Sequence, residues 1–164
     1  FPFMKRHSRA AIARNPALAS QDLETTRKAC EVYKESPVTV INFLEGTRFT
    51  PAKKAKTKSP YTHLLGPKYG GLSASLNAMG EQFEGMVNVT IAYGPSKGNI
   101  TWSWLCGKQP DMQVHIEVLP IPADMIAGDF RNDLEFKTRF KTWIGDIWTL
   151  KDQRLAEMRR KAGH

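Results

Sequence analysis

Residues 38–51 read Val-Thr-Val-Ile-Asn-Phe-Leu-Glu-Gly-Thr-Arg-Phe-Thr-Pro. The β-branched and apolar residues at the start favour a strand over residues 38–44. An acid, a glycine, a threonine and an arginine follow directly. Ligands in α/β folds bind at the carboxyl ends of strands, and the planar guanidinium of Arg48 suits phosphate or carboxylate. The stretch therefore predicts an anion site at a strand end. Gly46 permits a sharp turn there.

The role of Glu45 stays open at this point. Its carboxylate can hold the guanidinium of Arg48, or accept a hydrogen bond from a substrate hydroxyl or a backbone amide. A plain ion pair between Glu45 and Arg48 at the end of a strand is the structural alternative, since paired charges are often structural.

The pattern around this stretch is typical of a single α/β domain over residues 1–164. Apolar periodicity predicts helices over residues 22–35 and 72–79, and alternation predicts strands over 86–93, 101–105 and 112–119. The first two of these strands would form a hairpin. We therefore expect a mixed central sheet flanked by helices.

Residues 51–70 are expected to be a long loop, because proline and lysine are frequent in them. Four lysines crowd its start: Lys53, Lys54, Lys56 and Lys58. A solvated loop and a loop that contacts lipid headgroups or the phosphates of a cofactor are both compatible with this composition.

The longest helical pattern, residues 132–161, is amphipathic. Asn132 followed by Glu135 resembles a capping box at its start. Apolar residues recur along one stripe: Phe136, Phe140, Trp143, Ile144, Ile147, Trp148, Leu155 and Met158. Packing of this stripe on the domain is the structural interpretation, and a basic helix lying on a membrane is the alternative.

Charge narrows the class of partner. The chain of 164 residues has a formal net charge of +8, and residues 1–60 carry 12 Lys/Arg against 5 Asp/Glu. A basic region attracts nucleic acid, anionic lipid, nucleotide cofactors or phosphorylated substrates. Nucleic acid is disfavoured because the basic region contains no tryptophan. Cys30 and Cys106 show neither metal-site nor disulfide spacing, so no metal is expected.

Residues 43–48, Phe-Leu-Glu-Gly-Thr-Arg, resemble the Phe-Pro-Glu-Gly-Thr-Arg block of the 1-acylglycerol-3-phosphate acyltransferases, within the lysophospholipid acyltransferase superfamily. Supporting blocks lie in the same order along residues 1–120: Phe3-Met4-Lys5-Arg6, Lys68-Tyr69-Gly70-Gly71 and Val89-Thr90-Ile91-Ala92. The sequence of residues 22–30 and 42–51 is most similar to that of bacterial inner-membrane acyltransferases of the YihG type.

The chain departs from the family in two places. Thr90 stands where the family has a proline. The family's catalytic His-x-x-x-x-Asp is missing, because none of the four histidines (His7, His63, His115 and His164) has an aspartate five residues later. We expect a chain that is truncated at its N-terminus, has no catalytic residue of its own, and is inactive by itself.

The resemblance implies transfer of a fatty acyl group from acyl-CoA or acyl carrier protein to a lysophospholipid such as lysophosphatidic acid, with no bound cofactor. In the family, arginines of these blocks hold the phosphate of the acceptor, which places Arg6 and Arg48 on that phosphate. Glu45, Gly46 and Thr47 would shape the site, and Lys5 and Arg9 are weaker candidates.

The resemblance also places the protein at the cytoplasmic face of an inner membrane, in contact with an anionic surface. The alternative function is a non-catalytic basic module that binds anionic membrane surfaces or, less expected, nucleic acid.

Overall fold

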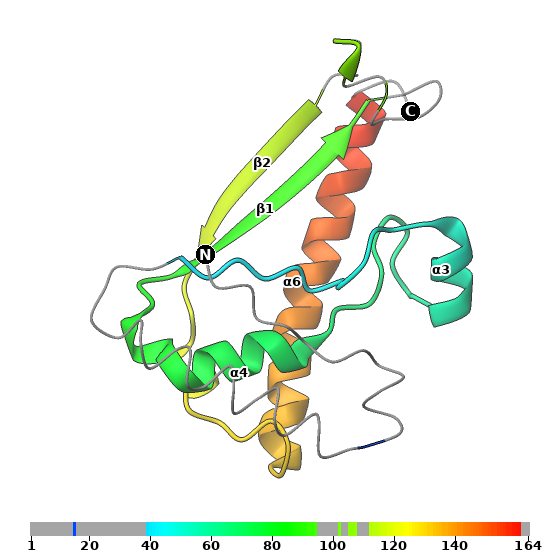
Figure 1. Ribbon diagram of the computed structural model, residues 1–164. Helices are drawn as coiled ribbons and strands as arrows, with labels where there is room; N and C mark the ends of the chain where they lie inside the picture. Colours follow the sequence, from blue (N-terminus) through cyan, green and yellow to red (C-terminus); the bar gives the residue numbers. More distant parts are fainter. Residues whose placement is uncertain (1–14, 16–38, 95–101, 103–104, 108–111, 162–164) are drawn as a thin grey trace. The chain divides into compact units, whose positions relative to one another are not determined.

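The computed structural model describes residues 15, 39–94, 102, 105–107 and 112–161 (Figure 1). Its main elements are α3 (Pro51–Thr57), α4 (Tyr69–Met79), β1 (Met86–Tyr93), β2 (Met112–Leu119) and α6 (Leu134–Lys161), with 3₁₀ turns at Gly80–Gln82 and Ala123–Met125. The described part of the chain is mixed α/β, with a two-stranded antiparallel sheet and a long C-terminal helix. The predicted helix over residues 22–35 lies outside the described residues, as does Arg6.

Two units make up the chain, and we describe each by itself. The first contains residues 1–44, 68–84 and 121–140, and the second contains residues 45–67, 85–120 and 141–164. The prediction of one domain over the whole chain stays a prediction.

The first unit is built on α4 and an aromatic cluster. Leu76 and Met79 on α4 are almost fully buried. The ring of Phe130 packs against Phe140 with centroids 5.5 Å apart, and Tyr69 lies 6.1 Å from Phe130. The helix predicted over residues 72–79 is confirmed, and it begins three residues earlier.

The second unit contains the sheet, in which β1 pairs with β2 from Met86 opposite Leu119 to Tyr93 opposite Met112. The strands predicted over residues 86–93 and 112–119 are confirmed. The predicted hairpin with residues 101–105 is wrong. Trp102 and Leu105 lie in a helical turn, in which the backbone N–H of Cys106 donates to the carbonyl of Trp102 over 3.0 Å.

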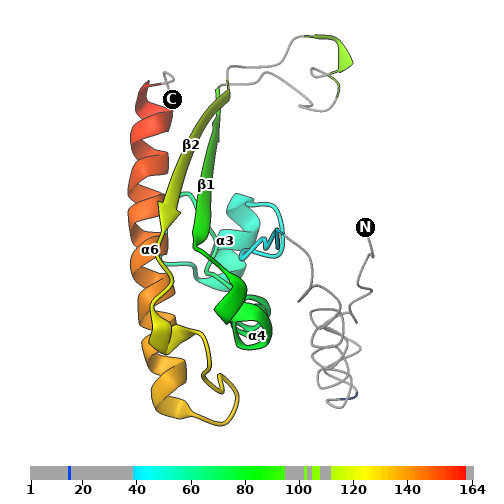
Figure 2. The same cartoon turned by 90° about the vertical axis from the view of Figure 1, so that its left-hand side faces the viewer.

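The sheet has two unlike faces. The inner face packs on α6 (Figure 2) and carries Asn88, Thr90, Ala92, Gln113, His115 and Glu117. The outer face is exposed and apolar, and it carries Val87, Val89, Ile91, Tyr93, Met112, Val114, Ile116 and Val118.

α6 confirms the predicted long helix, although its start differs. Oδ1 of Asp133 accepts the backbone N–H of Phe136 over 2.9 Å, so Asp133 caps the helix and the capping box predicted from Asn132 is wrong.

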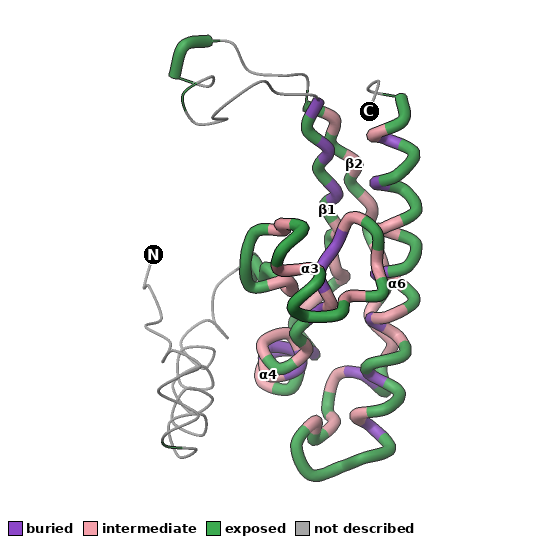
Figure 3. The backbone as a smooth tube through the Cα atoms, turned by 90° about the vertical axis from the view of Figure 1, so that its right-hand side faces the viewer, coloured by how far each residue is buried: buried purple, intermediate pink, exposed green. Residues whose placement is uncertain are grey.

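Buried positions recur along α6 (Figure 3): Phe136, Phe140, Ile144, Trp148, Leu155 and Met158. Because protein covers this stripe, a membrane contact would need another surface. No helix in the described part of the chain has the length and apolar run that a membrane crossing requires.

Two further predictions are wrong. The described part of the strand expected over residues 38–44 has no strand pairing, and Ile41 and Phe43 are 77% and 82% exposed. Its β-branched sequence finds no partner strand there, and the carbonyl of Leu44 instead accepts the N–H of Lys68 over 2.7 Å. The loop expected over residues 51–70 begins with α3, because Thr50 caps a helix whose first residue is proline.

Candidate functional site

The Glu45–Arg48 turn is fixed at its acidic end. Oε2 of Glu45 accepts the backbone N–H of Leu65 over 2.9 Å. The carbonyl of Leu65 in turn accepts the indole N–H of Trp148 on α6, also over 2.9 Å. Gly46 follows with φ of +61°, a left-handed conformation that suits glycine. Of the roles considered for Glu45, the structure shows acceptance from a backbone amide.

The basic end of the turn is open to solvent. Nζ of Lys53 donates to Oγ1 of Thr47 over 2.7 Å and to the carbonyl of Arg48 over 3.1 Å. Arg48 itself is exposed, and no ion pair joins it to Glu45 within the described residues. The turn thus holds the ammonium of Lys53 against the backbone of Arg48 and leaves the guanidinium of Arg48 exposed, where it can meet an anion.

A second anchored segment, residues 59–65, lies in the same unit. The carboxylate of Asp152 on α6 accepts two backbone N–H groups, from Thr62 over 2.8 Å and from His63 over 2.7 Å. The hydroxyl of Ser59 donates to the carbonyl of Leu64 over 2.8 Å. These bonds determine where the side chain of His63 lies.

The ring of His63 faces a cation. Nη1 of Arg159 lies 3.3 Å from Nδ1 of His63. Burial lowers the pKa of His63, and the positive charge of Arg159 lowers it further, while the charge of Asp152 opposes them. Nε2 of His115 is buried without a partner, and no hydrogen bond or ion pair joins a ring of the two described histidines to a carboxylate.

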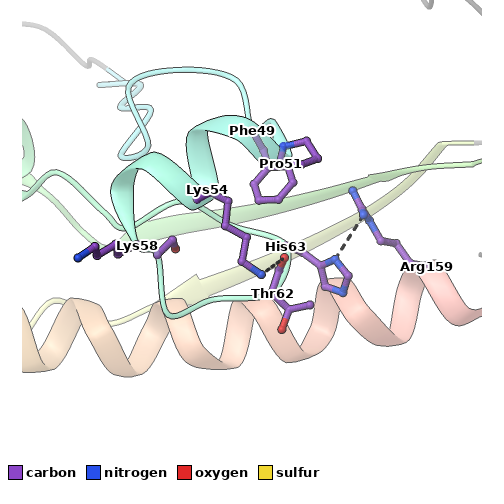
Figure 4. A pocket seen from close by; sticks show the side chains of 9 residues that line it. Phe49, Pro51, Lys54, Lys58, Thr62, His63 and Arg159 are labelled. Carbon is purple, nitrogen blue, oxygen red and sulfur yellow. Dashed lines mark hydrogen bonds between the residues drawn. The ribbon is translucent and has the colours of Figure 1, made fainter.

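An open hollow with a volume of about 530 Å³ adjoins this segment (Figure 4). We call it the basic hollow, and its lining residues are Phe49, Pro51, Lys54, Ala55, Lys58, Ser59, Thr62, His63 and Arg159. Sequence reasoning missed His63 and Arg159 as a pair. They are 96 residues apart, and nothing in a single sequence couples two such positions.

Lys151 links α6 to the inner face of the sheet. Its Nζ donates to Oδ1 of Asn88 over 2.7 Å and to the carbonyl of Val89 over 2.6 Å. Burial lowers the pKa of Lys151, and the charges of Glu45 and Glu117 oppose that shift. The sequence placed Lys151 only on a basic helix face.

Comparisons with the models of known protein families, with curated proteins and with solved structures found no match. Among the described residues, no three His, Cys, Asp or Glu side chains are grouped to hold a metal ion. The candidate site therefore depends on its own geometry and on the resemblance of its motif.

Proposed function

We propose that this chain belongs to an enzyme that transfers a fatty acyl group from acyl-CoA or acyl carrier protein to the hydroxyl of a lysophospholipid such as lysophosphatidic acid. One observation carries the proposal: an exposed Arg48 stands on a glycine turn whose acid, Glu45, is fixed by a backbone N–H. A fixed turn with a free guanidinium suits a phosphomonoester, which accepts two parallel hydrogen bonds from arginine.

In this proposal Arg48 orients the acceptor through its phosphate, and the family resemblance assigns the same role to Arg6, which lies outside the described residues. A histidine outside residues 1–164 takes the proton of the acceptor hydroxyl, the oxygen attacks the thioester carbonyl, and the thiol of the donor leaves with a proton. When the phosphate is held, the acceptor hydroxyl is fixed relative to that histidine. This positioning raises the rate of acyl transfer.

The test uses the longest natural form of the protein, with lysophosphatidic acid and acyl-CoA. Arg48→Ala is expected to lower kcat/KM for the acceptor about tenfold or more, since a charge-assisted hydrogen bond is worth about 1.5–3 kcal/mol. Arg154→Ala, which removes another exposed arginine, on α6, is the control and should leave kcat/KM unchanged. Equal kinetics for both variants would remove Arg48 from the site.

The 164-residue chain alone should give no turnover in the same assay. Robust turnover by this chain would contradict the placement of the base outside it.

The outer face of the sheet favours a second function, docking on an anionic lipid surface. Its cross-strand pairs are apolar throughout, for example Val87 opposite Val118 and Val89 opposite Ile116, and Ile116 and Val118 are 63% and 73% exposed. Soluble proteins rarely expose a continuous apolar patch of this kind without using it. α3 and its C-cap residue, in the same unit as the sheet, carry four lysines: Lys53, Lys54, Lys56 and Lys58. An exposed apolar face and a lysine-rich helix in one unit match the apolar and anionic parts of a bilayer interface.

Flotation with phosphatidylcholine vesicles, with and without phosphatidic acid, tests this docking. We expect binding only to the anionic vesicles and its loss in Ile116→Asp. Leu150→Asp, which changes an exposed leucine on α6, is the matched control and should bind normally. Unchanged flotation of Ile116→Asp would exclude the outer face, and a gel shift with duplex DNA distinguishes lipid binding from general attraction to phosphates.

A further inference from the structure

We propose that the basic hollow binds the phosphate group of a phosphomonoester. This site is separate from Arg48, which does not line the hollow, and it does not depend on the acyltransferase proposal. The basic hollow lies within the second unit, between α3, the 59–65 segment and α6.

Three positive or hydrogen-bond-donating side chains meet in the basic hollow from three different segments. Lys54 reaches it from α3, His63 from the 59–65 segment and Arg159 from α6 (Figure 4). Nζ of Lys54 donates one hydrogen bond to the carbonyl of Thr62 over 3.2 Å. An ammonium has three N–H groups, so two remain for a ligand. Lys58 extends away from His63 in Figure 4 and stands at the margin.

The guanidinium of Arg159 is only partly used. Nη1 faces His63, whereas Nε is buried and has no hydrogen-bond partner. A buried donor without a partner is costly, so its presence beside an open hollow points to a ligand that the side chain reorients to meet. Arginine has no acceptor, and its fork of donors matches the oxygens of a phosphate.

The contact with Arg159 also determines which ring nitrogen of His63 carries the proton and can donate it to a ligand. Because a guanidinium only donates, Nδ1 of His63 must accept, and the neutral ring therefore carries its proton on Nε2. The ring thus offers an N–H as a third donor. The negative charge of a bound anion favours the protonated ring and so opposes the lowering of the pKa of His63 by burial and by Arg159.

No acid balances these groups in the lining. None of the nine lining residues is Asp or Glu. Asp152, the acidic group whose charge acts on His63, already accepts two backbone N–H groups with its two oxygens. A cationic hollow without a counter-ion in its lining favours an anion of more than one charge.

The size and walls of the basic hollow indicate a phosphate that is attached to something larger. About 530 Å³ falls within the range of ordinary small-molecule sites, roughly 300–1,000 Å³, and exceeds what one inorganic phosphate fills. Phe49 and Pro51 form an apolar wall (Figure 4). The same phosphate chemistry can come from a soluble phosphomonoester or from the headgroup of phosphatidic acid.

Titration calorimetry of the 164-residue chain with glycerol 3-phosphate tests the soluble source, and flotation with vesicles that contain phosphatidic acid tests the lipid source. For whichever source binds, Arg159→Gln is expected to weaken binding about tenfold or more. Arg160→Gln removes the same charge from the next residue of α6, which is exposed and does not line the hollow, and should change binding less than twofold. Equal weakening by both variants, or no binding of either probe, overturns the proposal.

Lys54→Gln is the second variant, in case Arg159→Gln perturbs folding. It should also weaken binding several-fold while leaving the circular dichroism spectrum unchanged. Normal binding by a folded Lys54→Gln would contradict the convergence of Lys54 and Arg159 on one ligand.

Sulfate gives an independent measurement, because its charge does not change in the range where histidine titrates. Its binding should strengthen as the pH falls through the pKa of His63, which the charges of Lys54, Arg159 and Asp152 influence. The pH dependence should disappear in His63→Gln. A pH dependence that survives in His63→Gln would remove His63 from the site.

Discussion

The inner and outer faces of the β1–β2 sheet carry opposite chemistry, and they reverse the usual arrangement. The inner face is largely polar, yet Thr90 and Ala92 on it are each 2% exposed. The outer face is apolar, yet Val87 and Val118 on it are 59% and 73% exposed. The inner face lies against α6, where Lys151 supplies donors to Asn88 and to the β1 backbone. The difference teaches that contact with α6, not hydrophobicity, determines which side of this sheet is buried.

An aspartate introduced on each face in turn should reveal the largest difference between the two faces. Ala92→Asp should lower the free energy of unfolding by about 3 kcal/mol or more, since it buries an uncompensated carboxylate. Ile91→Asp, one residue away on the outer face, should cost about 1 kcal/mol or less through lost cross-strand contacts. Urea unfolding of both variants measures the difference. Equal losses would mean that the outer face is also covered.

Removal of the half-buried ammonium of Lys151 tests what holds the inner face to α6. Lys151→Met should lower the free energy of unfolding by about 1–3 kcal/mol, because it leaves Oδ1 of Asn88 and the carbonyl of Val89 without their donor. Thermal and urea unfolding are the measurements. A stabilised variant would show that the cost of burying the ammonium exceeds the gain from its hydrogen bonds.

The polar attachment of α6 extends beyond the sheet to the 59–65 segment. Asp152→Asn should lower the free energy of unfolding by about 1–2 kcal/mol, because an amide offers one oxygen where the carboxylate accepts from both Thr62 and His63. Asp146→Asn, an exposed site on the same helix, is the control. Hydrogen exchange of the amides of residues 62 and 63 should accelerate only in Asp152→Asn, and unchanged exchange would contradict the assignment.

The smallest expected effect is a pH dependence from His63. Its pKa is lowered in the folded chain, so the unfolded chain binds the proton more readily. The stability that this difference contributes is fully present above the usual pKa of histidine and is lost as the pH falls through the lowered value. His63→Gln should remove this pH dependence of the unfolding free energy between the lowered pKa and the usual pKa of histidine. An identical pH profile for the variant and the original chain would show that another group is responsible.

Several elements follow from local pattern alone. Alternation gave the bounds of β1 and β2, and apolar spacing gave α4 and α6, because these periods reflect backbone geometry that each segment carries by itself. Pattern failed for residues 39–44 and for the hairpin, because a strand needs a partner and the sequence does not say which segment supplies one. The candidate turn at Glu45–Arg48 was visible from residue type, and the role of Glu45 was decided by Leu65.

Sequence by itself determined β1, β2, the long C-terminal helix and most of α4, together with the basic character of the chain and the glycine turn that presents Arg48. Only the tertiary structure decided which face of the sheet is buried, which lysine of α3 reaches the basic hollow, and that His63 meets Arg159. The physical reason is distance along the chain. Propensity and periodicity act over a few residues, whereas the contacts of Lys151, Asp152 and Arg159 join residues 62 to 96 positions apart.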